Sequence, residues 1–322
     1  MHQYKMMHFL ILGGYMKKID LHVDTLMLLS EQRDSSLLTN DFKIDLYKLK
    51  KADYLMQVFA VFVNPQDENY ASKVLKMIQL FHQEIQKNSK LIAPIYQYRD
   101  IIKNMKLNKI SALLSLESGL ILYHSNTMLD VLYDLGIRIL TLTWNEENSI
   151  GYSHLINEPL KCYGKKLISK LNSLGIAIDV SHLSDKGVLD VLKLSDKPIM
   201  ASHSNVREIC YHSRNLPLDI IKKINAKKGI IGLNFYPPFV SINKELAISD
   251  LISHINFLVK NDLLDVISIG TDFDGFSEET FIKDASMMDD LVSELYKAGY
   301  KTQMIEKIMY KNALRFLKSV LR

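Results

Sequence analysis

The chain has 322 residues, of which 48% are hydrophobic and 24% charged, and its formal net charge is +4. These values are ordinary for a globular protein, and a chain of this length can bury a large core without disulfides or a structural metal. Its 40 basic residues are interspersed with 36 acidic ones. Because there is no long run of like charges, nothing indicates a nucleic-acid partner.

Residues 1–15 differ in character from the rest. Their apolar run covers only about five residues, shorter than the h-region of a signal peptide and far shorter than a membrane span. A second methionine, Met16, then begins a strand-like segment. We expect residues 1–15 to be a loose extension and residues 16–322 to form one domain with no membrane segment. The two cysteines, Cys162 and Cys210, fit a reducing compartment, so we expect a cytoplasmic protein.

Short aliphatic runs alternate with longer amphipathic stretches, a pattern that predicts βα units and a parallel sheet. The predicted strands are 17–23, 54–63, 111–117, 138–143, 176–181, 198–202, 229–235 and 266–271. The predicted helices are 69–87, 127–135, 160–174, 185–194, 216–226, 248–261, 286–298 and 302–320. The Pro237-Pro238 pair is interpreted as a loop. We therefore predict a single (β/α)₈ TIM barrel, with a doubly wound open sheet as the alternative, since periodicity does not show closure.

The first predicted strand ends in His22 and Asp24. Residues i and i+2 of a strand point to the same side, so these two side chains can reach one metal ion. Imidazole and carboxylate ligands suit Zn²⁺ and similar ions. Taken alone, the pattern equally describes a polar strand end in which Asp24 caps the next helix.

Four further predicted strands end in side chains of the same kind. They are Glu117, His182, His203 and Asp272, which follow the third, fifth, sixth and eighth predicted strands. Singly, each fits a salt-bridged or structural residue. A carboxylate buried beside an apolar strand needs a cation or a partner, however, and the functional side chains of a barrel gather at the carboxyl ends of its strands. The joint pattern therefore predicts a metal site on a barrel.

These motifs resemble the membrane dipeptidase (renal dipeptidase) family, peptidase family M19, within the metal-dependent hydrolase barrels. The resemblance runs from about Lys17 to the carboxyl terminus, in the family's order and with similar spacing. It rests on His22-Val23-Asp24, Glu117-Ser118-Gly119, Leu140-Thr141-Leu142-Thr143, Ile178-Asp179-Val180-Ser181-His182, Ser202-His203-Ser204, Ser213-Arg214-Asn215, Asn234-Phe235-Tyr236 and Gly270-Thr271-Asp272-Phe273-Asp274-Gly275.

The resemblance implies a site for two zinc ions. In it, His22 and Asp24 would hold one ion, His182 and His203 would hold the other, and Glu117 would bridge them. Two zinc ions about 3.5–4 Å apart can share a water molecule and lower its pKa towards neutrality. Imidazoles and carboxylates suit this chemistry because such ligand sets leave coordination positions open for water and substrate.

The resemblance also implies roles for residues around the metals. Asp272 matches a catalytic aspartate that takes the water's proton, Arg214 matches an arginine that binds the substrate's free carboxylate, and Tyr236 lies in a matching pocket loop. One position departs from the pattern, because Trp144 stands where better-known members carry a histidine that holds the carbonyl oxygen. We expect Trp144 to form a wall of the substrate pocket. His154, ten residues on, is a candidate to reach into the pocket from the loop in place of the missing histidine.

The function implied is a zinc-dependent dipeptidase whose partner is a small dipeptide. Hydrolysis of another small amide, or of a dipeptide with a D residue, is an alternative on the same site. A non-catalytic ligand-binding barrel is an alternative of a different class, although neither a metal ligand nor Asp272 is lost. The family often forms dimers, so a homodimer is one expectation. The lipid-anchored form of the animal enzymes is not expected, since neither a clear secretion signal nor a hydrophobic C-terminal tail is present.

Overall fold

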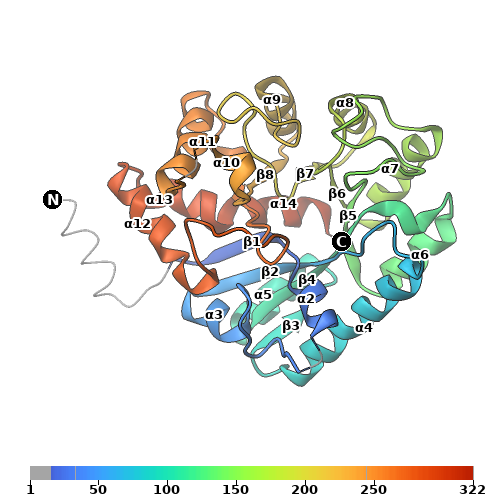
Figure 1. The fold of residues 1–322 in the computed structure, drawn as a ribbon, viewed down its shortest axis with the longest axis horizontal. Coiled ribbons are helices and arrows are strands. Elements are labelled where there is room, and N and C mark those ends of the chain that lie inside the picture. The colour runs from blue at the N-terminus through green and yellow to red at the C-terminus, as the bar shows by residue number, and fades with distance from the viewer. Residues whose placement is uncertain (1–15, 33, 244, 322) are drawn as a thin grey trace.

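The computed structural model describes residues 16–32, 34–243 and 245–321 (Figure 1). Its parallel strands are β1 (Lys18–Val23), β2 (Tyr54–Val61), β3 (Ile92–Pro94), β4 (Ile110–Glu117), β5 (Ile137–Thr141), β6 (Ala177–Asp179), β7 (Met200–Ala201), β8 (Ile230–Leu233) and β9 (Ile267–Ile269). Eight of them pair in the order β2-β1-β9-β8-β7-β6-β5-β4, and a further pairing of β2 with β4 closes the ring. The predicted barrel is confirmed, and the open-sheet alternative is wrong. The predicted extension over residues 1–15 lies outside the described residues.

Each of the eight predicted strands corresponds to a strand of the closed barrel. Strand β3 was not predicted. It pairs with residues 110–112 of β4, whereas β5 pairs with residues 114–117 of that strand. A strand of three residues that ends in Pro94 is too short to show a period and carries a strand-breaking residue.

Helices surround the barrel (Figure 1). They are α2 (Thr25–Glu31), α3 (Leu46–Lys51), α4 (Tyr70–Lys87), α5 (Tyr98–Lys106), α6 (Asn126–Asp134), α7 (Cys162–Leu174), α8 (Asp185–Leu194), α9 (Leu218–Ala226), α10 (Pro237–Val240), α11 (Ile248–Lys260), α12 (Asp289–Lys297), α13 (Thr302–Glu306) and α14 (Asn312–Val320). The predicted helix over 302–320 is divided by a π-helical segment, Lys307–Lys311. The loop predicted at Pro237-Pro238 is wrong, because both prolines lie in the first turn of α10, where helical backbone N–H groups have no partner to lose.

Two apolar clusters fill the molecule. The larger one lies between the strands and the outer helices, and the smaller joins strand residues such as Ile19, Met56 and Met200 to Phe316 and Leu317 of α14. The strand residues of the smaller cluster lie towards the amino-terminal ends of the strands, so α14 closes that end of the barrel, and it lies behind the strands in Figure 1. The carboxyl ends of the strands are left free for a functional site.

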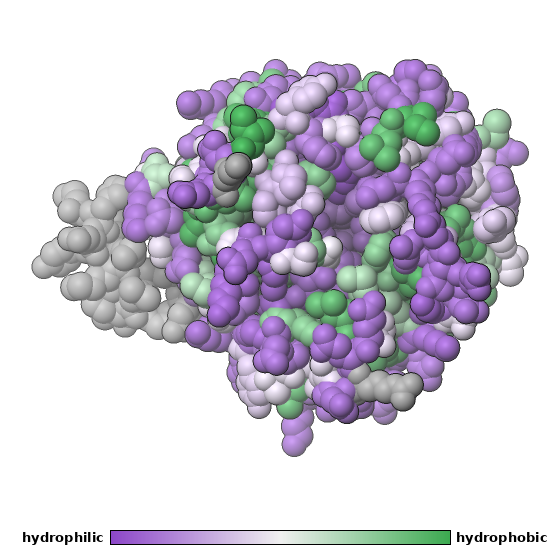
Figure 2. Space-filling model, viewed as in Figure 1, coloured by the Kyte–Doolittle hydropathy of each residue, from purple (hydrophilic) through white to green (hydrophobic). Residues whose placement is uncertain are grey.

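The face seen in Figure 2 is largely hydrophilic, with scattered hydrophobic side chains. Among the helices of the described residues, none combines the length and the apolar character needed to cross a membrane. Both Cys162 and Cys210 are free thiols.

The barrel interior is tightest where β8 and β9 pass the end of β7. A Cβ atom added at Gly232 would lie 1.9 Å from the backbone oxygen of Ser202, and one added at Gly270 would lie 1.7 Å from the same oxygen. Only glycine permits this approach, and the oxygen that both glycines face belongs to the residue before His203. The two glycines therefore allow the strand end that carries His203 to lie between its neighbours.

We predict that Gly270→Ala lowers the free energy of unfolding by about 1–3 kcal/mol, because a backbone carbonyl cannot rotate away from the new methyl group. Denaturant unfolding of the metal-free protein measures the change. Gly151→Ala is the matched control, since its nearest neighbours are leucine side-chain atoms at 3.2 and 3.3 Å, and it should cost less. Equal stability of Gly270→Ala and the wild type would contradict the prediction.

Candidate active site

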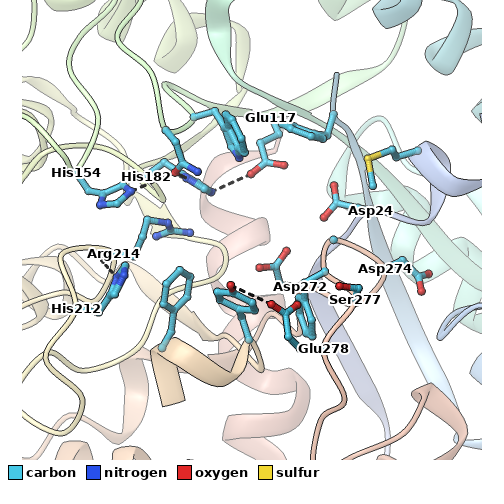
Figure 3. Close-up of a pocket in the computed structure, with 18 of the residues that line it drawn as sticks. Asp24, Glu117, His154, His182, His212, Arg214, Asp272, Asp274, Ser277 and Glu278 are labelled. Atoms are coloured by element: carbon cyan, nitrogen blue, oxygen red, sulfur yellow. Dashed lines mark hydrogen bonds and ion pairs between the residues drawn. The ribbon is translucent and has the colours of Figure 1, made fainter. Parts of the chain in front are cut away.

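A pocket of about 930 Å³ opens where the strands of the barrel end. It is lined by eight of the ten residues predicted from the sequence: Asp24, Glu117, Trp144, His154, His182, Arg214, Tyr236 and Asp272. The other two, His22 and His203, are 1% exposed and lie behind the pocket wall, where their Nε2 atoms face the carboxylate of Glu117. Figure 3 shows His154, His212 and Arg214 on one side of this pocket and Asp24 and Asp274 on the other. The structure thus brings all the predicted site residues together.

The carboxylate of Glu117, the last residue of β4, lies at the centre of the candidate metal ligands. Its Oε2 is 3.4 Å from Nε2 of His22, which in turn is 3.4 Å from Oδ2 of Asp24. Its Oε1 is 3.0 Å from Nε2 of His182 and 3.5 Å from Nε2 of His203. The two oxygens of one carboxylate therefore face two separate groups of ligands.

These five residues are nearly inaccessible to solvent, each at most 7% exposed. Within them, His22, Asp24 and Glu117 could hold one ion, and Glu117, His182 and His203 could hold another. Asp272 also lies within ligand distance of His22 and His203. The structure therefore assembles the two ligand groups that the sequence analysis expected, with Glu117 common to both.

The backbone at the strand ends is unusual. His182 has a φ of +67°, Asp272 of +62° and Asp274 of +68°, in the left-handed region that residues other than glycine rarely adopt. Such conformations cost of order 1–3 kcal/mol each and persist where the surrounding structure imposes them. Here they turn the chain sharply after β6 and β9, so that His182 and Asp272 point into the pocket.

The Nδ1 atom of His203 is held by a relay that the sequence analysis did not assign. Asp179 Oδ2 accepts a 2.6 Å hydrogen bond from the Ser202 hydroxyl, whose oxygen lies 2.7 Å from His203 Nδ1. Because the hydroxyl proton goes to Asp179, its oxygen must accept from Nδ1–H. The Nε2 lone pair of His203 then faces Glu117, as a metal ligand requires. Asp179 is buried inside a strand; that position and its place in the motif before His182 were its signals in the sequence.

A hydrogen-bond network also supports the first strand. Asp20 accepts from the backbone N–H groups of His22 and Thr271 and from the Thr271 hydroxyl. Burial raises the pKa of Asp20 to about 6, although these hydrogen bonds oppose the rise. Asp20 therefore ties the end of β1, which carries His22, to the residue before Asp272.

The electrostatics of the cluster call for a cation. Burial lowers the pKa of His182 and of His203 well below the ordinary value, and Arg214 and His22 add to the effect. Burial alone would lower the pKa of His22 too, but Glu117 and Asp24 outweigh it and raise that pKa well above its usual range. The carboxylates thus attract positive charge to a place from which water is excluded.

The buried polar atoms provide a direct test of whether a metal fits. Both ring nitrogens of His22 and Oδ1 of Asp24 are buried without a hydrogen-bond partner, a costly state unless another group binds them. Nε2 of His182 lies 3.0 Å from Nε2 of His203. With Nδ1 of His182 donating to Asn145 Oδ1 and Nδ1 of His203 donating to Ser202, both Nε2 atoms carry lone pairs, which repel unless a cation lies near them. Imidazole nitrogens and carboxylate oxygens are the ligands that zinc takes, so this donor set fits zinc ions.

Asp272 lies at the edge of the cluster, close enough to His22 and His203 to share a metal ion with them. Its Oδ2 accepts a 2.9 Å hydrogen bond from the side-chain amide of Asn234, and its Oδ1 is 3.9 Å from Nε2 of His22. Burial, together with the charges of Asp24 and Glu117, raises the pKa of Asp272 to about 7. A carboxyl group at this place in the pocket can take up a proton and return it to a bound molecule.

Arg214 is a buried cation without an ion-pair partner among the described residues. Its Nη1 donates to the Ser204 hydroxyl and its Nη2 to the backbone oxygen of His203, while its Nε has no partner. Burial lowers the pKa of Arg214 to about 10, and the charge of Asp272 opposes the fall. The guanidinium therefore stays charged at neutral pH and is available to an anion in the pocket.

The remaining predicted residues form the walls. Trp144 packs on Phe62, with ring centroids 5.0 Å apart, and lies 6.2 Å from the ring of His182. The hydroxyl of Tyr236 donates to Glu278 at 3.3 Å. His154 also lines the pocket, but both of its ring nitrogens already have partners, Ser213 and Asn145.

A closed parallel barrel with buried histidines and carboxylates at the carboxyl ends of its strands defines a metal-dependent hydrolase. The chain belongs to the membrane dipeptidase family (peptidase family M19), whose model matches residues 11–322. By family it is a metallo-dipeptidase, a hydrolase of peptide bonds.

Individual relatives agree with this assignment. The chain is 28% identical to dipeptidase tcpJ of Claviceps purpurea over 69% of its own length and 53% of that protein, so the match covers about half of the relative. It is 27% identical to dipeptidase aclJ of Aspergillus oryzae over 86% of its length and 70% of the relative. A metallo peptidase from Rhodobacter sphaeroides has the same fold, with a TM-score of 0.89 at 21% identity over 95% of this chain and 100% of the other.

We predict that Ser202→Ala weakens zinc binding about 10–100-fold, because His203 Nδ1 loses its acceptor and the ring loses its fixed orientation. Competition between the metal-free protein and a chromophoric chelator measures the affinity. Ser268→Ala is the control, since Ser268 is equally buried and its hydroxyl has no partner. If Ser202→Ala and Ser268→Ala bind zinc alike, the relay has no role in metal binding.

Proposed function

We propose that this chain hydrolyses dipeptides with free carboxylates, using two zinc ions held by its five buried ligands. The observation that carries the proposal is the buried, unpaired guanidinium of Arg214, which donates to the backbone oxygen of the ligand His203. A carboxylate bound by Arg214 therefore lies next to the ligand cluster. Only an amide bond close to that carboxylate can then reach the metals, which favours a dipeptide.

Each ligand has a place in this proposal. His22 and Asp24 would hold one zinc ion, His182 and His203 the other, and Glu117 would offer one oxygen to each, as the distances around it allow. When bound, two zinc ions would lower the pKa of a shared water and stabilise negative charge developing on the scissile carbonyl oxygen. Their number and identity are part of the proposal.

The chain's own groups would handle the proton and the substrate. Oδ2 of Asp272 is engaged by Asn234, so Oδ1 is the atom that would accept the proton of the attacking water and return it to the leaving amine. The planar fork of Arg214 suits a carboxylate. Trp144 and Tyr236 would shape the walls against which the substrate side chains pack.

A dipeptide with a carboxyl-terminal D residue is a second candidate substrate. The structure from Rhodobacter sphaeroides was obtained with a phosphinate mimic of the dipeptide L-Ala-D-Ala. Nothing in the described pocket separates the two configurations, so both belong in the first substrate panel. The cytoplasmic location and the homodimer remain predictions.

We predict that a chelator abolishes dipeptide hydrolysis and that zinc restores it at about two ions per chain, because no other described group of the site supplies comparable activation of water. Metal analysis of the isolated protein and rates before and after chelation test this. A metal-free protein that hydrolyses dipeptides at the full rate would contradict the proposal.

Asp272→Asn is the companion variant. It should keep both zinc ions while lowering kcat about 10²–10⁴-fold, since the amide cannot accept the proton. Loss of zinc instead would make Asp272 a ligand, which its distances to His22 and His203 also allow. An unchanged rate would refute its role in proton transfer.

We predict that Arg214→Met raises KM for dipeptides with a free carboxylate by about 10²-fold or more, because a charge-assisted bidentate contact is lost. Dipeptides amidated at the carboxyl terminus should be poor substrates for the wild type and should lose little further in the variant. Steady-state kinetics with L-Ala-L-Ala, L-Ala-D-Ala and their amides measures both effects. Equal turnover of free and amidated substrates by the wild type would exclude a carboxylate anchor at Arg214.

A further inference from the structure

The loop after β5 places a side chain behind the metal-ligand candidate His182. Oδ1 of Asn145 lies 2.7 Å from Nδ1 of His182, and the same oxygen lies 3.2 Å from Nε2 of His154. Neither Asn145 nor this contact belongs to the ligand set or the proton path described above. Asn145 also lines the pocket, so it lies between the metal site and the substrate space.

The contact sets which nitrogen of His182 can bind a metal. An amide oxygen only accepts hydrogen bonds, so His182 Nδ1 must carry the proton. The lone pair is then on Nε2, which lies 3.0 Å from Oε1 of Glu117 and so faces the ligand cluster. Were the amide reversed, its NH₂ group would face Nδ1 and the proton would move to Nε2, which would then be unable to bind a metal.

His154 extends the contact towards the substrate side. Its Nε2–H donates to Asn145 Oδ1, and its Nδ1 lies 2.7 Å from the hydroxyl of Ser213, which can donate to it. The backbone N–H of His154 donates to the backbone oxygen of His182 at 2.7 Å. With both ring nitrogens engaged, His154 has no donor left for a substrate, so it does not replace the histidine that Trp144 displaces.

The chain of hydrogen bonds ends beside the carboxylate anchor. Ser213 precedes Arg214 in the sequence, and its backbone oxygen accepts from Arg207, which is paired with Asp185 of α8. Figure 3 shows His154, His182 and Arg214 grouped on the same side of the pocket. Three side chains thus connect a metal ligand to the segment that carries Arg214.

We propose that Asn145 is a positioning residue that fixes His182 as a metal ligand, and that His154 and Ser213 transmit this order to the segment of Arg214. The proposal rests on the proposed function, since it assumes a metal at His182. Outer contacts of this kind typically contribute 10–100-fold to metal affinity, because an unsupported imidazole samples wrong tautomers and orientations.

The first test measures zinc affinity of the metal-free protein by competition with a chromophoric chelator, without an activity assay. Asn145→Ala should weaken zinc binding about 10–100-fold, whereas Asn145→Asp, which keeps an acceptor oxygen, should stay close to the wild type. Glu147→Ala is the control, because Glu147 lies in the same loop and pairs with Lys161 at the exposed surface. Wild-type affinity in Asn145→Ala, or equal losses in the Ala and Asp variants, would overturn the role of Asn145.

The second test separates binding from chemistry. His154→Phe keeps an aromatic ring but removes the ring's hydrogen bonds to Asn145 and Ser213. Because only the bond to Ser213 reaches the segment of Arg214, KM for a free dipeptide at saturating zinc should rise about fivefold, the equivalent of one hydrogen bond. The value of kcat should change little. An unchanged KM, or a fall in kcat alone, would overturn the link to Arg214. If the wild type binds zinc but hydrolyses no dipeptide, the proposed function fails, and the zinc affinities of the Asn145 variants still decide the inference.

Discussion

The buried carboxylate of Glu117 is the constraint on which the rest of the site depends. A carboxylate that is 3% exposed is costly unless positive charge surrounds it. Glu117 meets His22 of β1 on one side, with β2 between their strands, and His182 after β6 on the other, with β5 between. Only closure of the barrel brings both partners to one carboxylate. The set of ligand candidates therefore exists only if the barrel closes.

Two further carboxylates hold the strand ends in the same manner. Oδ1 of Asp20 accepts from the backbone N–H groups of His22 and Thr271, while Oδ2 accepts from the Thr271 hydroxyl. Asp179 repeats the pattern with the N–H groups of Ser181 and Ser202 and the Ser202 hydroxyl. In each case the hydroxyl-bearing residue directly precedes a site residue, Asp272 or His203. These hydrogen bonds therefore join the ends of adjacent strands directly beside the residues that carry the site's side chains.

Much of this could be predicted from the sequence, because strand-end polar residues and βα alternation are local patterns. Eight strands and all five ligand candidates were predicted at their positions. Asn145 and Asp179 were not assigned roles, because each contacts a partner distant in sequence, His182 or Ser202, that only the folded barrel brings near. Strand β3 and helix α10 were not predicted for a local reason: each has too few residues to show a period.

Trp144 stands where the family resemblance implied a histidine, and the structure shows what this position contacts instead. The Trp144 ring packs on Phe62 and supplies an apolar wall, a role that a polar imidazole fills less well. The next residue, Asn145, takes up the polar contact to His182. Two neighbouring residues of the loop after β5 thus differ in role, since Trp144 forms an apolar wall of the pocket and Asn145 contacts the ligand candidate His182. Because both ring nitrogens of His154 are engaged by Asn145 and Ser213, His154 supplies no replacement donor, and under the proposed function the metal ions would have to stabilise the carbonyl oxygen.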